Sequence, residues 1–119
     1  MSAVTRGAKK VAGSLTVGIL PNKLTAPSPH IDIAIVTDMN EARNNINVLS
    51  SDVIIACGRA GPGTASEIAL AVKARKTVIL LGGTESAAHF FRELSPENVI
   101  EVASPPEAIE IAKRINFQP

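Results

Sequence analysis

A glycine-rich run between an apolar segment and a helix-forming segment constrains the fold more than any other part of this sequence. The run extends from Gly58 to Glu67 (GRAGPGTASE), follows the apolar segment 51–57, and leads into a helix that we predict from Ala65 to Arg75. Glycines allow a tight turn and let a ligand approach the backbone closely. The helix that follows offers unpaired N–H groups and the positive end of its dipole. The pattern therefore indicates an anion site, most often one for a phosphate.

The alternation of apolar segments with amphipathic ones predicts the fold class. We expect strands at 15–20, 31–36, 51–57, 77–81 and 99–102, and helices at 2–12, 38–49, 65–75, 86–93 and 105–115. Such alternation is typical of a parallel sheet with helices on both faces. The sequence thus predicts an α/β chain, a three-layer Rossmann-like fold with a mainly parallel sheet of about five strands flanked by helices. Ligands bind such sheets at the carboxyl ends of the strands.

The same patterns predict which residues are buried. Segment 53–57 is apolar throughout, which is typical of a strand buried on both faces, and Cys57 at its end is expected to be a core thiol. The spacing from Asp38 to Glu41 is that of a helix N-cap with a capping box. The predicted inward-facing helix positions are Met39, Ala42, Ile46 and Leu49, then Ala65, Ile68, Ala69 and Val72, then Phe90, Phe91 and Leu94.

Composition limits the classes of partner. The 119 residues suffice for one domain with one core. A formal net charge of +1 and an aromatic content of 3% give no basis for binding nucleic acid or an anionic membrane surface. We find no membrane-spanning run and no secretion signal, so we expect a cytoplasmic location. His30 and His89 have no metal-ligand neighbours in the sequence, and no metal site is predicted.

Two common nucleotide-binding motifs do not fit the glycine-rich run. Gly58 and Gly63–Thr64 match the ends of a P-loop, but no lysine follows Gly63, which argues against triphosphate hydrolysis. The spacing Gly61-x-Gly63-x-x-Ser66 nearly matches the dinucleotide fingerprint, but the next strand ends without an acidic residue to hold a ribose. A phosphate site and a plain tight turn without a ligand both remain open at this point.

Polar residues near the run are candidates for the same site. Arg43 lies in the first turn of its predicted helix, where the dipole disfavours a positive charge, so a ligand-facing role competes with that of an exposed or ion-paired arginine. Glu67 stands three residues after Thr64, so it could either close a capping box or accept hydrogen bonds from a sugar or a pterin. Asn44 and Asn47 could bond a ligand or a neighbouring loop.

Residues 36–81 resemble a known superfamily. The resemblance is carried by the segments 36–44 (VTDMNEARN), 51–56 (SDVIIA) and 61–67 (GPGTASE), and 17–21 (VGILP) also fits. These segments are similar to the Lonely-guy, or lysine-decarboxylase-like, Rossmann superfamily, and within it to the molybdenum cofactor carrier and binding proteins. The resemblance implies a parallel sheet flanked by helices and assembly into a homo-oligomer, a dimer or a tetramer.

The resemblance also implies a ligand, the molybdenum cofactor (molybdopterin), held by a carrier or storage protein with the pterin phosphate near the glycine turn. The cofactor-binding residues that it implies are Gly58, Gly61, Pro62, Gly63, Thr64, Ala65, Glu67, Arg43 and Asn44. The alternative is a nucleoside 5'-monophosphate phosphoribohydrolase of the Lonely-guy type, with Arg43 and Glu67 as catalytic residues. Glu41 and Asn44 stand where these enzymes have histidine and lysine, and Pro62 replaces their usual aromatic residue. Both departures favour the carrier.

The start of the chain departs from the superfamily pattern. Members open with a strand, a helix and a second strand, and the helix that comes next resembles segment 1–8 (MSAVTRGA). We therefore interpret 1–119 as a single Rossmann-like domain that lacks the first strand-helix-strand unit. Strands near the middle of the sheet would then be missing. The exposed edges would need cover, and oligomerisation is one route.

Overall fold

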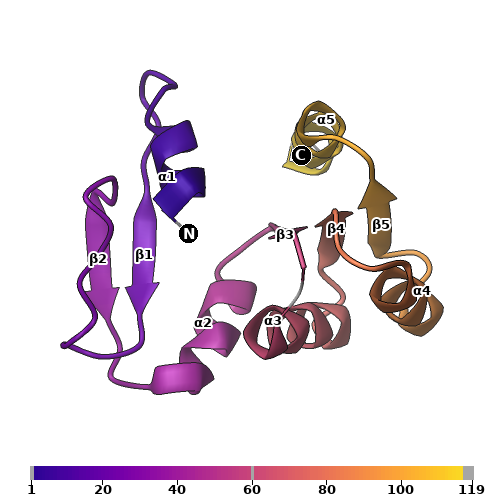
Figure 1. The fold of residues 1–119 in the computed structure, drawn as a ribbon, viewed down its shortest axis with the longest axis horizontal. Coiled ribbons are helices and arrows are strands. Elements are labelled where there is room, and N and C mark those ends of the chain that lie inside the picture. Colours follow the sequence, from indigo (N-terminus) through magenta and orange to yellow (C-terminus); the bar gives the residue numbers. More distant parts are fainter. Residues whose placement is uncertain (1, 60, 117–119) are drawn as a thin grey trace. The chain divides into compact units, whose positions relative to one another are not determined.

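The computed structural model describes residues 2–59 and 61–116, and the chain divides into two compact units, 1–43 and 44–119 (Figure 1). The helices are α1 (Ser2–Ala8), α2 (Arg43–Leu49), α3 (Pro62–Lys73), α4 (Glu85–Leu94) and α5 (Pro105–Asn116), with a 3₁₀ turn η1 (Asn40–Ala42) before α2. The strands are β1 (Val17–Leu20), β2 (Ile33–Val36), β3 (Val53–Cys57), β4 (Thr77–Leu81) and β5 (Val99–Val102). The order of helices and strands confirms the predicted α/β class. Within the described residues, no helix has the length and apolar character needed to cross a membrane.

The strands form two parallel sheets, each smaller than the predicted sheet of about five strands. In the first unit β1 pairs with β2, from Val17 opposite Ile33 to Leu20 opposite Val36. In the second unit the order is β3–β4–β5, with β4 in the centre. Since β3 lies at an edge of its sheet, residues 53–56 are half-buried, and the prediction of burial on both faces is wrong.

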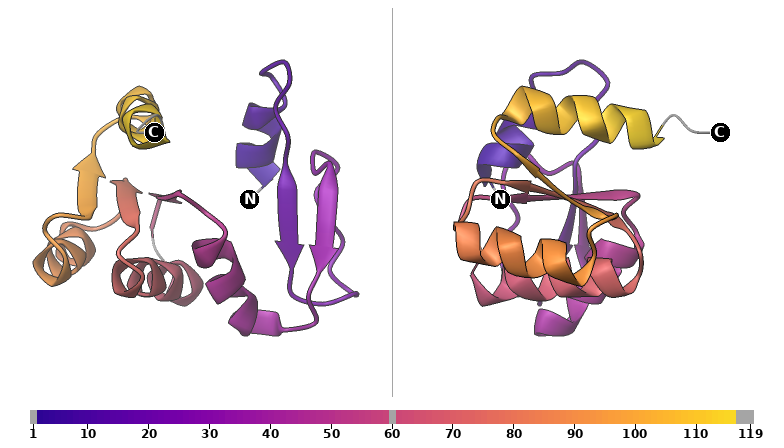
Figure 2. Two further views of the ribbon diagram at one scale, coloured as in Figure 1. Left: turned by 180° about the vertical axis from the view of Figure 1, so that it is seen from behind. Right: turned by 90° about the vertical axis from the view of Figure 1, so that its right-hand side faces the viewer.

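Helices cover both faces of the sheet in the second unit (Figure 2). Successive residues of β4 point to opposite faces, so Val78 and Leu80 join one apolar cluster and Ile79 joins the other. The first cluster contains residues of α2, α3 and α4. The second contains Val102 of β5 and Ala108 of α5. Burial on both faces explains why β4 consists of apolar residues after Thr77.

The helix before β3 starts differently from the prediction. Asp38 has a positive φ of 56°, and η1 follows Met39 with no side-chain cap, so the predicted N-cap and capping box are wrong. The 3₁₀ turn replaces the first helical turn, and α2 then buries Asn44 and Val48. The predicted inward positions Met39, Ala42 and Leu49 are exposed.

Two later helices also present narrower buried faces than predicted. In α3, Ile68 and Ala71 are buried, whereas Ala69 is exposed. In α4, Phe91 is buried, whereas Phe90 and Leu94 are each 55% exposed. Each helix packs against the sheet with one stripe only, so apolar residues beside that stripe stay in contact with solvent.

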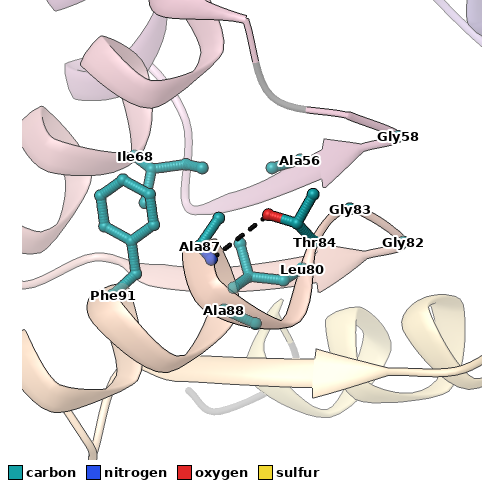
Figure 3. A pocket seen from close by; sticks show the side chains of 10 residues that line it. All are labelled: Ala56, Gly58, Ile68, Leu80, Gly82, Gly83, Thr84, Ala87, Ala88 and Phe91. Carbon is teal, nitrogen blue, oxygen red and sulfur yellow. Dashed lines mark hydrogen bonds between the residues drawn. The ribbon is translucent and has the colours of Figure 1, made fainter.

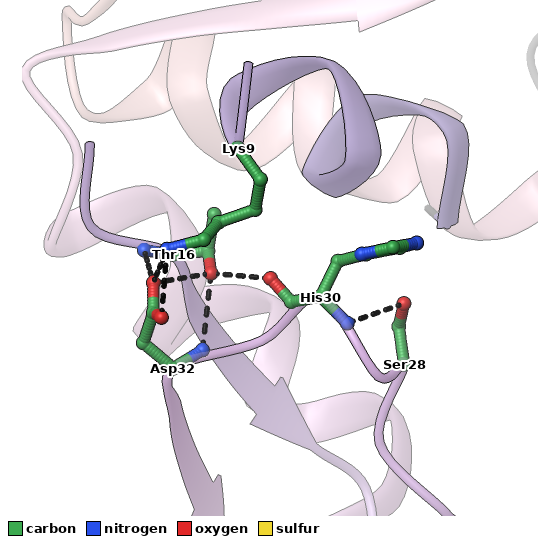
Figure 4. A network of polar contacts seen from close by, with 5 residues as sticks. All are labelled: Lys9, Thr16, Ser28, His30 and Asp32. Atoms are coloured by element: carbon green, nitrogen blue, oxygen red, sulfur yellow. Dashed lines mark hydrogen bonds and ion pairs between the residues drawn. The ribbon is translucent and has the colours of Figure 1, made fainter. Parts of the chain in front are cut away.

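In the first unit a carboxylate joins the segment after α1 to the start of β2 (Figure 4). Lys9 Nζ donates to both oxygens of Asp32, at 2.8 and 3.0 Å. The Thr16 backbone N–H and hydroxyl each lie 2.8 Å from Asp32 Oδ2. The hydrogen bond from Lys9, followed by those from Thr16, lowers the pKa of Asp32 from 3.8 to about 2. The folded state therefore prefers the ionised carboxylate.

Replacing Asp32 by Asn should make the chain less stable at neutral pH and less sensitive to acid. A lowered pKa in the folded state contributes stability above pH 3.8 that is lost as the pH falls towards about 2. Urea unfolding at pH 5 and pH 2.5 measures both effects. Asp38→Asn is the control, because no hydrogen bond of the Asp38 side chain is seen among the described residues. An equal loss on acidification in wild type and Asp32→Asn would contradict the assignment.

Candidate functional site

The carboxyl ends of β3 and β4 lie beside each other, and each is followed by glycine. Gly58 has a φ of 75°, and Gly82 and Gly83 have φ values of 77° and 114°. The Gly58 N–H donates to the carbonyl of Leu81 at 2.9 Å, which continues the pairing of the strands into the turn. A Cβ on Gly83 would lie 3.4 Å from the Gly58 carbonyl oxygen. The two turns therefore need glycine for their backbone angles, and a Cβ at Gly83 would be in van der Waals contact with the other turn.

A small pocket opens between these turns, α3 and α4 (Figure 3). Its rim consists of Gly58, Gly82, Gly83 and Thr84, and its floor of Ala56, Ile68, Leu80, Ala87, Ala88 and Phe91. Thr84 caps α4 by accepting from the Ala87 N–H at 3.4 Å. The pocket volume of about 20 Å³ holds a water molecule and no larger ligand, so a bound molecule would lie outside it.

Sequence reasoning did not identify Gly82, Gly83 and Thr84 as part of this site. The signal was present, because a strand, a glycine turn and a helix follow one another here as they do after β3. In a parallel sheet, turns after neighbouring strands emerge at the same edge.

Helix α3 begins at Pro62, three residues before its predicted start. Gly61 is the N-cap and carries no side-chain cap, and the Ala65 N–H makes a helical bond to the Gly61 carbonyl at 2.9 Å. Pro62, Gly63, Thr64 and Ala65 thus lie in the first helical turn rather than in a loop. Because Thr64 is inside the helix, the capping-box explanation of Glu67 is wrong. An anion is one group that can cap such a helix end.

The glycines of this turn leave the backbone open. A Cβ built at Gly58, Gly61 or Gly63 would meet nothing within 4 Å among the described residues. Gly61 has an ordinary φ of −76°, and Gly63 lies in the helix, so neither is required by backbone strain. The amide of Gly58 is already bonded to Leu81 and is not available to a ligand.

Glu67 and Asn47 form a pair in the second unit. Asn47 Nδ2 donates to Glu67 Oε1 at 2.9 Å, which orients the carboxylate. Both residues line a groove of about 220 Å³ along β3. From the sequence, Asn47 could bond either a ligand or a neighbouring loop. The structure shows a third role, because Asn47 is the hydrogen-bond partner of Glu67.

Arg43 and Asn44 stand at the boundary between the units. Arg43 belongs to the first unit, where its Nη1 lies 3.4 Å from the carbonyl oxygen of Ile19. Asn44, the first residue of the second unit, is 4% exposed. The glycine turn, Glu67 and Asn47 therefore belong to the second unit, whereas Arg43 belongs to the first unit, as β1 does.

Two other residues considered in the sequence, Cys57 and His89, are exposed. Cys57 is exposed, contrary to the prediction of a core thiol, because it ends an edge strand. His89 Nε2 lies 4.0 Å from a carboxylate oxygen of Glu93 on the surface of α4. In the part of the chain that the structure describes, no three His, Cys, Asp or Glu residues are grouped as metal ligands would be.

Replacing Gly83 by Ala should destabilise the second unit by about 2 kcal/mol, because alanine would have to adopt a φ of 114°, outside the regions open to L residues. Gly58→Ala is the control, because its φ of 75° lies close to the left-handed helical region. We expect a smaller loss for the control in urea unfolding. Equal losses would mean that the larger φ of Gly83 adds no strain.

Comparison with known proteins places the chain among a defined set of relatives. The sequence model of the SLOG cluster4 family matches residues 1–109. Over 81 residues, or 68% of the chain, the sequence is 49% identical to an uncharacterized protein of Archaeoglobus fulgidus. That match spans 52% of the archaeal protein, so the chain covers about half the length of this curated relative.

Solved structures give longer matches. The molybdenum cofactor binding protein from the phototrophic bacterium Rippkaea orientalis has a TM-score of 0.91 and 51% identity, over 98% of this chain and 71% of that one. The molybdenum cofactor carrier protein from Chlamydomonas reinhardtii has a TM-score of 0.88 and 44% identity, over 99% of this chain and 71% of that one. More than a quarter of each solved chain thus has no counterpart in residues 1–119.

Proposed function

The chain belongs to the SLOG cluster4 family, and from this premise we propose that it binds a phosphorylated small molecule, the molybdenum cofactor, as a carrier or storage protein. The observation that carries the proposal is the 51% identity, over 98% of the chain, to the molybdenum cofactor binding protein of R. orientalis. The similarity to the carrier protein of C. reinhardtii supports the same ligand.

The first turn of α3 suits the phosphate of that ligand. Gly61 caps the helix without a side chain, and the space beside Gly61 and Gly63 is open, so a phosphate can reach the backbone. A negative charge at a helix N-terminus is stabilised by typically 0.3–1 kcal/mol at an exposed position. The proposed phosphate site comprises Gly61 to Thr64, with Gly58 shaping the turn, because the Ala65 N–H is already bonded to the Gly61 carbonyl. The pterin lies outside the small pocket, which has room only for water.

The polar candidates contact the rest of the ligand in this proposal. The carboxylate of Glu67, oriented by Asn47, accepts hydrogen bonds from the pterin ring. Arg43 contributes positive charge, as the resemblance implies, whereas Asn44 is 4% exposed and makes no ring contact in this proposal. A homo-oligomer in the cytoplasm, a dimer or a tetramer, is part of the same proposal.

Replacing Gly63 by Ala tests the phosphate site without disturbing the fold. The new Cβ meets nothing within 4 Å, and alanine in a helix is more favourable than glycine, so stability should be equal or higher. The affinity for molybdenum cofactor should fall at least about tenfold, which corresponds to about 1.4 kcal/mol of binding free energy. Thermal shift and the molybdenum content after gel filtration measure this change.

Gly7→Ala in α1 is the matched control, because it is also a helical glycine with open space at the Cβ position. It should retain wild-type binding. Unchanged cofactor binding by Gly63→Ala would show that the ligand does not approach this backbone, and the phosphate site would have to be abandoned.

Incubation with AMP separates the carrier from a phosphoribohydrolase. We expect no adenine above the blank, measured by liquid chromatography, in wild type and in Glu67→Ala alike. Glu93→Ala, at an exposed position of α4, is the control for loss of a carboxylate. Adenine release by wild type that Glu67→Ala abolishes and Glu93→Ala retains would replace the carrier proposal with the hydrolase.

A further inference from the structure

Lys76, the residue before β4, is bonded to the end of α2. Its Nζ donates to the carbonyl of Leu49, the last residue of α2, at 3.1 Å and to the carbonyl of Ser51 at 2.6 Å. The last carbonyls of a helix have no partner within the helix, and the negative end of the dipole favours a cation there. Among the described residues, Lys76 forms no salt bridge. Its ammonium group is therefore held by the end of α2 rather than by an acidic side chain.

A chain of hydrogen bonds leads from Lys76 to a candidate site residue. The Ser51 carbonyl accepts from Lys76, and the Ser51 hydroxyl donates to the carbonyl of Asn47 at 2.7 Å. The Asn47 side chain in turn donates to Glu67 Oε1 at 2.9 Å. These bonds connect the segment before β4 with α2 and α3, and all of them lie within the second unit.

Helix α2 depends on this connection because it has little other support in the second unit. It is seven residues long, and helices this short are marginal in water without tertiary contacts. Among the described residues of α2, only Val48 joins the buried apolar cluster. A hydrogen bond of 2.9 Å is lost when its atoms move apart by about 0.7 Å. A small displacement of the helix end would therefore separate Asn47 from Glu67.

We propose that Lys76 is a positioning residue for the carboxylate of Glu67, acting through Ser51 and Asn47. Its effect on ligand binding rests on the proposed function, in which Glu67 accepts hydrogen bonds from the pterin ring. Asn47 occupies Oε1, and Oε2 of Glu67 has no partner among the described residues, so Oε2 is left to the ligand. Without the ammonium group, Glu67 would still be present but its carboxylate would no longer be held in one orientation.

The side-chain amide of Asn47 reports on this connection without any ligand. In NMR spectra of isotope-labelled protein, its N–H signals should differ from those of Asn45, an exposed residue of the same helix. In Lys76→Met, the Asn47 signals should move towards the position of the Asn45 signals. Ser51→Ala removes only the hydroxyl and should move them in the same direction, whatever the stability of Lys76→Met. Lys73→Met, in the last turn of α3, is the control for loss of a positive charge and should leave them unchanged.

The affinity for molybdenum cofactor measures the consequence for binding. Lys76→Met should weaken binding about fivefold in the otherwise wild-type chain. In the Asn47→Ala background the same substitution should change binding less than about twofold, because the last bond of the chain is already absent. A loss caused only by lower stability of the fold would be equal in the two backgrounds, so the comparison separates positioning of Glu67 from general support of α2.

Two results would overturn the proposal. One is an Asn47 amide that is unchanged in both Lys76→Met and Ser51→Ala. The other is an equal loss of cofactor affinity in the presence and absence of the Asn47 side chain. Failure of the wild-type chain to bind the cofactor would instead refute the proposed function, and the amide signals would still decide whether Lys76 positions Glu67.

Discussion

The contact between the turns after β3 and β4 determines what the rest of the second unit can do. The hydrogen bond from Gly58 to Leu81 continues the pairing of the strands, and a Cβ on Gly83 would lie 3.4 Å from the Gly58 carbonyl oxygen. With the turns fixed against each other, α3 and α4 both start at the same edge of the sheet. The open backbone of the α3 N-terminus is thus a consequence of strand pairing and not of the loop alone.

Backbone angles distinguish the glycines that the fold requires from those that alanine could replace without strain. Gly83 is constrained by its φ of 114°, whereas Gly61 and Gly63 have neither a strained φ nor a neighbour within 4 Å of a built Cβ. Glycine is common at an N-cap such as Gly61, but inside a helix it costs stability relative to alanine, so Gly63 in the first turn of α3 needs another reason. Close approach of a ligand to the backbone supplies one, and it agrees with a ligand too large for the small pocket behind the turns.

The sequence predicted the order of the elements because apolar periodicity is local, and β4 and β5 were predicted with their observed bounds. It did not predict what depends on neighbours distant in the chain. The 3₁₀ turn at Asn40–Ala42 rotated the buried face of α2 to Asn44 and Val48, and no propensity indicates such a rotation. Cys57 was expected in the core because β3 is apolar, but whether an apolar strand is interior depends on the strand next to it. The Asn47–Glu67 pair was missed because the two residues are 20 positions apart.

Strand β3 connects two parts of the proposed site. Its carboxyl end leads into the glycine turn, and its length forms the groove that Glu67 also lines. Asn47, which orients Glu67, lines the same groove. The position of β3 therefore affects both the backbone proposed to hold the phosphate and the carboxylate proposed to contact the pterin.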